Sequence, residues 1–292
     1  MLDRLIYADW ENPPDAMAFE APLGELLDRI HALLPGVLAG REAALADPAS
    51  APPAFWADCM SLYLYTPALV NVALNYKICV EQGLPLHPTY YFQLGERERF
   101  QTDHTPEVAA EAQVHFLAAI ATARAIFALE PGCLELLDAY VKMLPSTIRT
   151  FVYVSTQDKY TWRASNPRRI EALAETVKQA LRPVVVVGAA HGSILSGLTF
   201  ANLMGAPLYF VRFSMFKRND KAPIVAPSDL AFLEPFHPGP ALLFDEDVAK
   251  GTTLTKFTQV LSPLFRECAT ASVLRHALSP CRPDFTGHAW SD

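Results

Sequence analysis

One short segment of the chain combines carboxylates with a glycine and hydroxyl groups. Asp245 and Glu246 end an apolar run, and the turn Gly251–Thr253 follows closely. Carboxylates accept hydrogen bonds from sugar hydroxyls. A glycine turn that opens a helix presents free backbone N–H groups, which bind phosphate. The segment therefore offers what a phosphorylated ribose needs, acceptors for the sugar and donors for the phosphate.

The elements around this segment place it at a functional edge. Residues 241–244 are all apolar, as in a strand buried on both faces, and residues 252–264 form an amphipathic run typical of a helix. The carboxylates thus lie at the carboxyl end of a strand. Open α/β sheets bind their ligands at this end.

The same segment resembles the loop of type I phosphoribosyltransferases that binds PRPP, the pyrophosphorylated ribose 5-phosphate. In that family a hydrophobic strand runs into two acidic residues, and a glycine and a hydroxyl-bearing turn follow. The resemblance implies that Asp245 and Glu246 are catalytic and hold the ribose. It implies that the ribose 5′-phosphate lies on the turn that follows, formed by Ala249, Lys250, Gly251, Thr252 and Thr253.

Three positions depart from the family pattern. Glu246 stands where a second aspartate is usual, and Asp247 stands where an apolar residue is usual. Ala249 occupies the position at which purine-type enzymes place the aspartate that activates the base. Either another group moves this proton, or the acceptor is not an ordinary purine.

A second loop follows the apolar run 184–187 and reads Gly188–Ser193. The family binds the pyrophosphate of PRPP on the backbone of the equivalent loop. The resemblance assigns this role to Ala189, Ala190, His191 and Gly192, with His191 in place of the usual basic residue. The alternative is a plain tight turn between a strand and a helix.

Basic and aromatic residues supply the remaining candidates. The run 206–212 resembles the second strand of the family, and Arg212, Lys217 and Arg218 would face the pyrophosphate. These cations can equally belong to a solvated loop. Phe285 and Trp290 lie in a tail that resembles an element near the hood of hypoxanthine-guanine-type enzymes. They would stack on a base or pack the tail down.

The resemblance implies Mg²⁺-dependent transfer of phosphoribosyl between PRPP and a nucleobase or nucleotide, with release of pyrophosphate. This is a glycosyltransferase reaction of nucleotide metabolism. Mg²⁺ uses few protein ligands and several substrate oxygens, so Asp245 and Glu246 would hold it indirectly. The family is commonly homodimeric.

Bulk composition narrows the class of protein. The chain has 292 residues and a formal net charge of −7, which argues against nonspecific binding of nucleic acid. Five scattered cysteines lack zinc spacing and predict reduced thiols in the cytoplasm. Charged residues near the N-terminus argue against a signal peptide, and polar residues interrupt every long apolar stretch, which argues against a membrane span.

The two halves differ in pattern, which predicts an all-helical domain over residues 1–148 and a parallel-sheet α/β domain of the phosphoribosyltransferase type over 149–292. The role of the first domain stays open and includes binding a partner protein. The expected helices are Leu23–Leu38, Ala54–Gln82, Pro106–Leu129 and Cys133–Leu144 in the first part, with Arg168–Leu181 and Ser193–Met204 in the second. The expected strands are 151–155, 184–187, 208–212, 241–244 and 272–276.

The sequence lacks the motifs of several other functions. A nucleotide-hydrolysing P-loop, a dinucleotide-binding glycine motif and a serine nucleophile elbow are all missing from the sequence. Two alternatives stay open. One is a non-catalytic sensor or regulator that binds PRPP or a nucleotide on the same fold. The other is an effector of a defence system that acts on nucleotides.

Overall fold

The computed structural model describes residues 2–215 and 218–291. The chain forms two compact units. The first comprises Met1–Asp9 and Pro13–Gln157, and the second comprises Trp10–Asn12 and Asp158–Asp292. A short N-terminal segment therefore belongs to the second unit. The domain boundary predicted between residues 148 and 149 stays a prediction.

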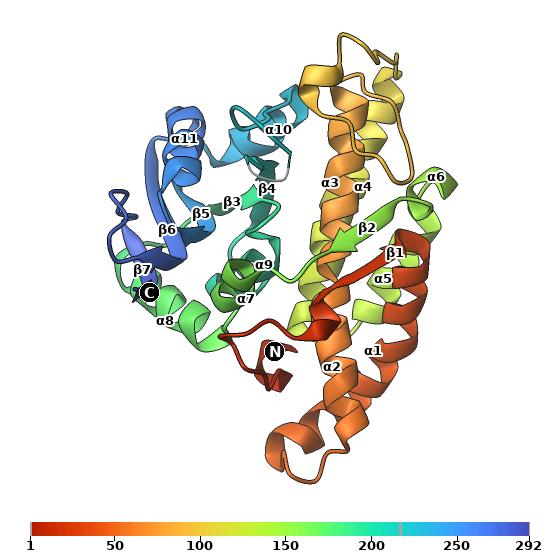
Figure 1. The fold of residues 1–292 in the computed structure, drawn as a ribbon, viewed down its shortest axis with the longest axis vertical. Helices are drawn as coiled ribbons and strands as arrows, with labels where there is room; N and C mark the ends of the chain where they lie inside the picture. The colour runs from red at the N-terminus through yellow and green to blue at the C-terminus, as the bar shows by residue number, and fades with distance from the viewer. Residues whose placement is uncertain (1, 216–217, 292) are drawn as a thin grey trace. The chain divides into compact units, whose positions relative to one another are not determined.

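Long helices dominate the first unit (Figure 1). They are α1 (Leu23–Ala46), α2 (Pro53–Tyr65), α3 (Pro67–Glu81), α4 (Pro106–Ala128), α5 (Cys133–Met143) and the short α6 (Ser146–Arg149). Helix α3 is buried along almost its whole length and packs against α4. The predicted start of α4 is confirmed, because Thr105 Oγ1 accepts a hydrogen bond from the N–H of Val108 at 3.4 Å. The short 3₁₀ turns of this unit are Leu2–Leu5, Asp15–Met17 and Leu94–Glu96.

The predicted helical character of this unit is confirmed, but two details differ from the prediction. The helix expected over Ala54–Gln82 is interrupted at Thr66, and α3 starts with Pro67 in its first turn. Proline lacks the N–H that would continue the helix, yet it suits a helix start. The unit is also not purely helical, since β1 (Phe19–Pro22) pairs antiparallel with β2 (Val152–Ser155). The strand expected at 151–155 thus exists, but outside the parallel sheet.

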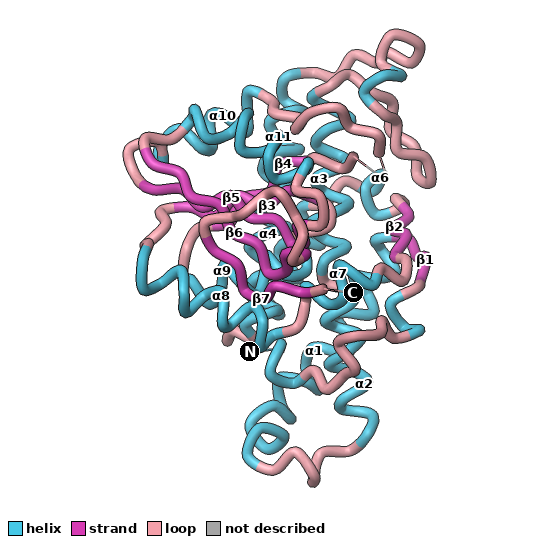
Figure 2. The backbone as a smooth tube through the Cα atoms, turned by 60° about the vertical axis from the view of Figure 1, so that its left-hand side comes forward, coloured by secondary structure: helices cyan, strands magenta, loops and turns pink. Residues whose placement is uncertain are grey.

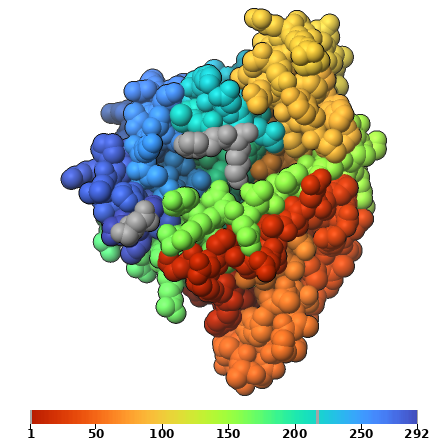
Figure 3. All heavy atoms as spheres, in the orientation of Figure 1, coloured from red at the N-terminus to blue at the C-terminus, as the bar shows by residue number. Residues whose placement is uncertain are grey.

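The polar segment between α3 and α4 includes His87–His104, which is rich in aromatic residues. It forms the surface at one end of the first unit, shown in amber in Figure 3. The hydroxyl of Tyr91 donates a hydrogen bond to the carbonyl of Val152 at 3.0 Å. His104 Nε2 lies 2.8 Å from the carbonyl oxygen of Leu84. These contacts fix the segment to its own unit.

The second unit contains a five-stranded parallel sheet, drawn in magenta in Figure 2. Its strands in spatial order are β4 (Leu208–Arg212), β3 (Val185–Ala190), β5 (Pro240–Val248), β6 (Glu267–His276) and β7 (Phe285–Trp290). The predicted parallel α/β architecture is confirmed. Strand β3 and the first five residues of β5 after Pro240 are buried, as their apolar runs predict.

Helices cover both faces of this sheet (Figure 2). Helices α8 (Pro167–Ala180) and α9 (Ile194–Met204) lie on one face, and α10 (Pro227–Leu233) and α11 (Thr252–Leu261) on the other. The short α7 (Lys159–Ala164) packs against α9 and β5, and 3₁₀ turns occupy Glu234–Phe236 and Ser262–Leu264. Phe200 of α9 stacks on Phe244 of β5 with ring centroids 5.0 Å apart, which ties helix and strand together.

Strand lengths at the carboxyl edge of the sheet differ from the sequence prediction. Strand β5 continues to Val248, so Asp245, Glu246 and Asp247 lie within it. Strand β7 was not predicted, because its mixed polar and aromatic sequence has no clear alternation. Across the described residues no helix combines the length and apolarity that crossing a membrane requires. None of the described cysteines forms a disulfide bond.

Candidate active site

The loops after β3 and β5 meet at the point where the strand order reverses. From β3 the chain passes to β4 on one side and then returns to β5 on the other side. All strands are parallel, so the carboxyl ends of β3 and β5 lie next to each other. Such a switch point is where open α/β sheets form a crevice for ligands. The topology therefore brings together two of the loops that the sequence singled out.

Gly192 packs directly against the side chain of Glu246. A Cβ atom placed on Gly192 would lie 1.7 Å from Glu246 Oε1 and 2.4 Å from its Cδ. No residue other than glycine fits there without moving the carboxyl group. The loop after β3 and the acidic pair are thus in direct contact.

Asp245 is buried, and Glu246 beside it is half-buried. Asp245 is 4% exposed, and its Oδ1 accepts a hydrogen bond from the N–H of Glu246 at 3.1 Å. Burial raises the pKa of Asp245 to about 6, although its hydrogen bond with the Glu246 side chain acts in the opposite direction. Burial, followed by the charge of Asp245, raises the pKa of Glu246 well above its usual range. Both side chains therefore bind a proton more tightly than an exposed carboxyl group does.

The expected phosphate turn follows strand β5. Gly251 has φ of 78°, a left-handed conformation that favours glycine, and helix α11 begins at Thr252. The first intrahelical hydrogen bond runs from the N–H of Thr255 to the carbonyl of Gly251 at 2.9 Å. The N–H groups that precede Thr255 in the first turn of the helix have no acceptor within the helix. Ala249, Lys250 and Thr252 are exposed, and Thr253 is half-buried, so a ligand can reach this turn.

The expected pyrophosphate loop is shorter than the sequence indicates. Ala189 and Ala190 lie within β3 and pair with Val211 and Arg212 of β4, so only His191 and Gly192 of the predicted set form the loop. The Ala190–His191 peptide bond is cis. Ser193 Oγ donates a hydrogen bond to the carbonyl of Ala189 at 2.7 Å, which fixes the turn.

Arg212 serves the fold in this structure. Its side chain is 1% exposed and forms two bonds with Asp220, from Nε at 3.1 Å and from Nη2 at 2.9 Å. Asp220 also accepts a hydrogen bond from the N–H of Ser214 at 2.8 Å. The pair anchors the start of the long loop after β4. Arg218 is half-buried in that loop, and Lys217 lies outside the described residues.

The two aromatic candidates of the tail lie at opposite ends of the edge strand β7. Phe285 pairs with Ala271, and Trp290 pairs with His276. Trp290 Nε1 donates a hydrogen bond to Oδ1 of Asp247 at 3.3 Å. Phe285 and Trp290 are therefore not neighbours, and of the two it is Trp290 that contacts the acidic run.

Sequence reasoning missed a second group of residues beside this run. Glu11 forms one ion pair with Arg163 and another with Arg169. These three residues line a pocket together with Trp290. Their positions are far apart in the sequence, and no motif links them. The signal that was present, two arginines around the start of an amphipathic helix, is common in helices that bind nothing.

The donor set suits an indirectly held Mg²⁺. Among the described residues, no group of three or more acidic, histidine or cysteine side chains is arranged to hold a metal ion by itself. Asp245 and Glu246 offer adjacent carboxyl oxygens, which are hard ligands of the kind Mg²⁺ takes alongside water and substrate oxygens. An ion that arrives with a pyrophosphate fits this arrangement.

Comparisons with known proteins point to one kind of structure. No protein-family model matches the chain, and no curated protein matches it in sequence. The parallel-sheet part is similar to a purine phosphoribosyltransferase from Pyrococcus horikoshii Ot3, with 20% identity over 44% of this chain and 86% of the other, and a TM-score of 0.35. It is similar to a hypoxanthine phosphoribosyltransferase from Staphylococcus aureus, with 18% identity over 44% and 74% and a TM-score of 0.34.

A hypothetical protein from Neisseria gonorrhoeae with bound ppGpp is similar as well, with 16% identity over 43% of this chain and 79% of the other, and a TM-score of 0.36. Similarity to solved phosphoribosyltransferase structures, expected from the motifs, is thus found for the part of the chain that contains the parallel sheet.

Proposed function

We propose that the second unit is a phosphoribosyltransferase that uses PRPP and Mg²⁺. The observation that carries the proposal is the contact between Gly192 and Glu246. It joins a loop suited to pyrophosphate and an acidic pair suited to ribose at the switch point of the sheet. The phosphate turn that begins helix α11 follows the same strand. Three proposed recognition elements for one ligand therefore follow two adjacent strands of the sheet.

The acidic pair would bind the two ribose hydroxyls. The oxygens of both side chains can accept hydrogen bonds from the hydroxyls, and a carboxyl group that holds its proton can also donate one. The 5′-phosphate would lie on the N–H groups of Thr252 and Thr253, with Lys250 providing a mobile positive charge. The ribose is thereby held at both ends, which orients its anomeric carbon.

The reaction we propose is a substitution at that carbon. A ring nitrogen of the acceptor forms a bond to the anomeric carbon, and the bond from this carbon to the pyrophosphate oxygen breaks. The electron pair leaves with pyrophosphate, and the proton of the ring nitrogen passes to solvent or to a nearby base. Mg²⁺ brought with PRPP would neutralise charge on the leaving group, and the backbone of His191 and Gly192 would stabilise it further.

The group that accepts the acceptor's proton differs from the purine pattern. Ala249 cannot do so, and Asp247 is already bonded to Trp290. Burial raises the pKa of Asp247 to about 6, so it is largely ionised near neutral pH. An acceptor that loses its proton easily needs no strong base, and such an acceptor fits this site.

The test is calorimetric titration of PRPP with Mg²⁺ into the full chain and into the double variant Asp245→Asn/Glu246→Gln. We expect wild-type binding and a loss of about tenfold or more in the double variant, corresponding to at least about 1.4 kcal/mol. Glu175→Gln, which removes an exposed carboxylate of helix α8, is the matched control and should bind as the wild type does. No binding to the folded wild type would overturn the proposal.

Turnover separates the enzyme from the alternatives. A transferase should release pyrophosphate when PRPP, Mg²⁺ and a suitable acceptor are supplied together. A sensor should bind PRPP and release none with any acceptor. A defence effector that acts on nucleotides should turn over a nucleotide instead.

A further inference from the structure

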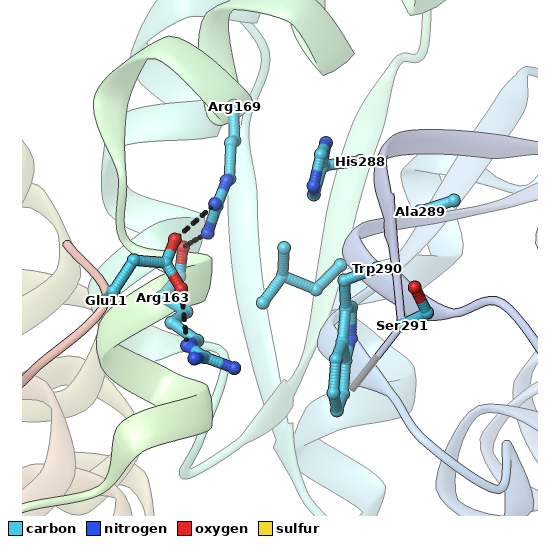
Figure 4. A pocket seen from close by; sticks show the side chains of 8 residues that line it. Glu11, Arg163, Arg169, His288, Ala289, Trp290 and Ser291 are labelled. Atoms are coloured by element: carbon cyan, nitrogen blue, oxygen red, sulfur yellow. Dashed lines mark hydrogen bonds and ion pairs between the residues drawn. The ribbon is translucent and has the colours of Figure 1, made fainter.

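A polar pocket of about 490 Å³ is lined in part by Trp290, the residue that bonds to Asp247 (Figure 4). Helices α7 and α8 contribute Arg163 and Arg169, and strand β7 contributes His288 and Trp290. Glu11 comes from the short N-terminal segment that belongs to this unit. A volume of this size accommodates a small planar molecule.

The two arginines face a single carboxylate. Glu11 Oε2 lies 2.9 Å from Arg163 Nε, and Glu11 Oε1 lies 2.7 Å from Arg169 Nη2. Figure 4 shows Glu11 between the two guanidinium groups. One carboxyl group thus spans both cations, and the cluster keeps a surplus of positive charge.

The arginines are the fixed part of this cluster and the carboxylate is the accessible part. The side chains of Arg163 and Arg169 are 17% and 19% exposed, whereas that of Glu11 is 51% exposed. Arg169 Nη1 also donates a hydrogen bond to the carbonyl of Arg163 at 3.1 Å, which orients its guanidinium. A ligand carboxylate can therefore replace Glu11 without rebuilding the site.

The pocket connects to the proposed PRPP site through Trp290. Its indole bonds to Asp247, two residues after Asp245, and the guanidinium of Arg163 lies 5.9 Å from its ring centroid. The carboxyl ends of β5, β6 and β7 are adjacent in the sheet, and Trp290, which lines the pocket, is the last residue of β7. The proposed reaction requires the acceptor to lie next to the anomeric carbon of the ribose, and this pocket is the candidate for that position.

We infer that this pocket binds the acceptor, and that the acceptor is a heteroaromatic acid whose carboxylate replaces Glu11 on Arg163 and Arg169. The inference rests on the proposed phosphoribosyltransferase function. The position of Glu11 supplies the geometry, since its own carboxyl group already makes the contacts that the ligand would make. A neutral ring that took the place of the Glu11 carboxylate would leave the two partly buried guanidinium groups without a counter-charge. This would cost binding free energy.

Matched pairs of small molecules test the inference. Nicotinate and nicotinamide share a ring, as do orotate and uracil, and only the first member of each pair carries a carboxylate. We expect calorimetry in the presence of Mg²⁺ to show a carboxylate member binding about tenfold or more tightly than its neutral partner. Equal affinity within both pairs would overturn the inference, and so would equal or tighter binding of inorganic phosphate.

Two variants locate the binding. Arg169→Ala should lower the affinity for the carboxylate member about tenfold or more, whereas Arg168→Ala, at the exposed neighbouring position, should leave it unchanged. Glu11→Gln removes the competing charge from an exposed position and should tighten binding several-fold. Equal effects of Arg169→Ala and Arg168→Ala, or weaker binding in Glu11→Gln, would contradict the inference.

Affinity for PRPP with Mg²⁺, measured on the same variants, keeps the two proposals apart. It should be unchanged in Glu11→Gln and Arg169→Ala if the pocket holds only the acceptor. A wild type that binds a heteroaromatic acid and no PRPP would contradict the transferase. A wild type that binds PRPP and neither acid would contradict the assignment of this pocket alone.

Discussion

Trp290 Nε1 donates a hydrogen bond to Oδ1 of Asp247 at 3.3 Å, which joins the last residue of the edge strand β7 to the acidic run of β5. Burial raises the pKa of Asp247 to about 6, while this hydrogen bond acts in the opposite direction and the charge of Asp158 adds to the increase. The edge strand therefore helps to set the charge at the candidate site.

The raised pKa of Asp247 predicts that Asp247→Asn stabilises the protein above about pH 6. The folded state binds this proton more tightly than the unfolded state does, so stability is greatest below the ordinary pKa of 3.8 and falls as the pH rises through about 6. Asparagine does not ionise and avoids this loss, which is on the order of 2 kcal/mol. Urea denaturation of both proteins at pH 4.5 and pH 7.5 measures the difference.

Trp290→Phe provides the complementary test of the same interaction. Removing the indole N–H should raise the pKa of Asp247 further, so the loss of stability should extend to higher pH. Stability curves for the wild type and Asp247→Asn that stay parallel between pH 4.5 and pH 7.5 would contradict both expectations.

The buried pair of Arg212 and Asp220 predicts a large effect of Asp220→Asn. The substitution leaves the Arg212 guanidinium, 1% exposed, without a compensating charge. Removing one partner of a buried ion pair costs about 3–5 kcal/mol. The free energy of unfolding from urea denaturation should fall by this amount, while Lys221→Ala at an exposed neighbouring position should change it by less than about 0.5 kcal/mol. An equally small effect of both variants would show that the pair is dispensable.

Sequence patterns predicted those elements of the second unit whose structure depends on residues close to one another in the sequence. The apolar runs of β3 and β4 and the amphipathic repeat of α8 specify buried strands and a surface helix, and these elements form close to where they were expected. The turn at Gly251 was also foreseeable, because a glycine before two threonines suits a left-handed residue at a helix start. Each of these signals lies within a few consecutive residues.

Features that depend on distant contacts were not foreseeable. Phe151–Ser155 reads as a strand, yet only the position of Phe19–Pro22 decides that it pairs outside the parallel sheet. Arg212 reads as a pyrophosphate ligand until Asp220 is seen against it. Glu11 and Arg169 pair although most of the first unit lies between them in the sequence. The pair forms only because Trp10–Asn12 packs with the second unit.

The backbone at Gly251 predicts that Gly251→Ala destabilises the protein through two separate effects. Its φ of 78° strains an alanine, and a Cβ atom there would lie 2.0 Å from Cβ of Cys281. Strain alone costs about 1–2 kcal/mol. Gly205→Ala is the matched control, because Gly205 has φ of 63° and no atom within 4 Å of the added Cβ.

Thermal unfolding should therefore show a larger loss for Gly251→Ala than for Gly205→Ala. Adding Cys281→Gly to Gly251→Ala removes the collision and should reduce the loss to about that of the control. Equal losses for the two alanine variants would mean that the contact with Cys281 relaxes freely.

The contact between Gly192 and Glu246 predicts that Gly192→Ala impairs binding of PRPP more than it impairs folding. An added Cβ would lie 1.7 Å from Glu246 Oε1, so the carboxyl group must rotate out of its place in the acidic pair. A displacement of this kind at a binding site costs on the order of tenfold or more in affinity. Calorimetric titration with Mg²⁺ and PRPP measures this loss, and thermal unfolding reports the change in stability.

A double variant identifies the collision as the cause. Glu246→Ala removes the group that the new methyl would strike, so Gly192→Ala should cost little additional stability in that background. The coupling between the two substitutions should be on the order of 1–3 kcal/mol, as for residues in direct contact. Strictly additive losses would show that the loop after β3 moves away from β5 at no cost. In that case the two loops would not form the single rigid site on which binding of ribose and pyrophosphate together depends.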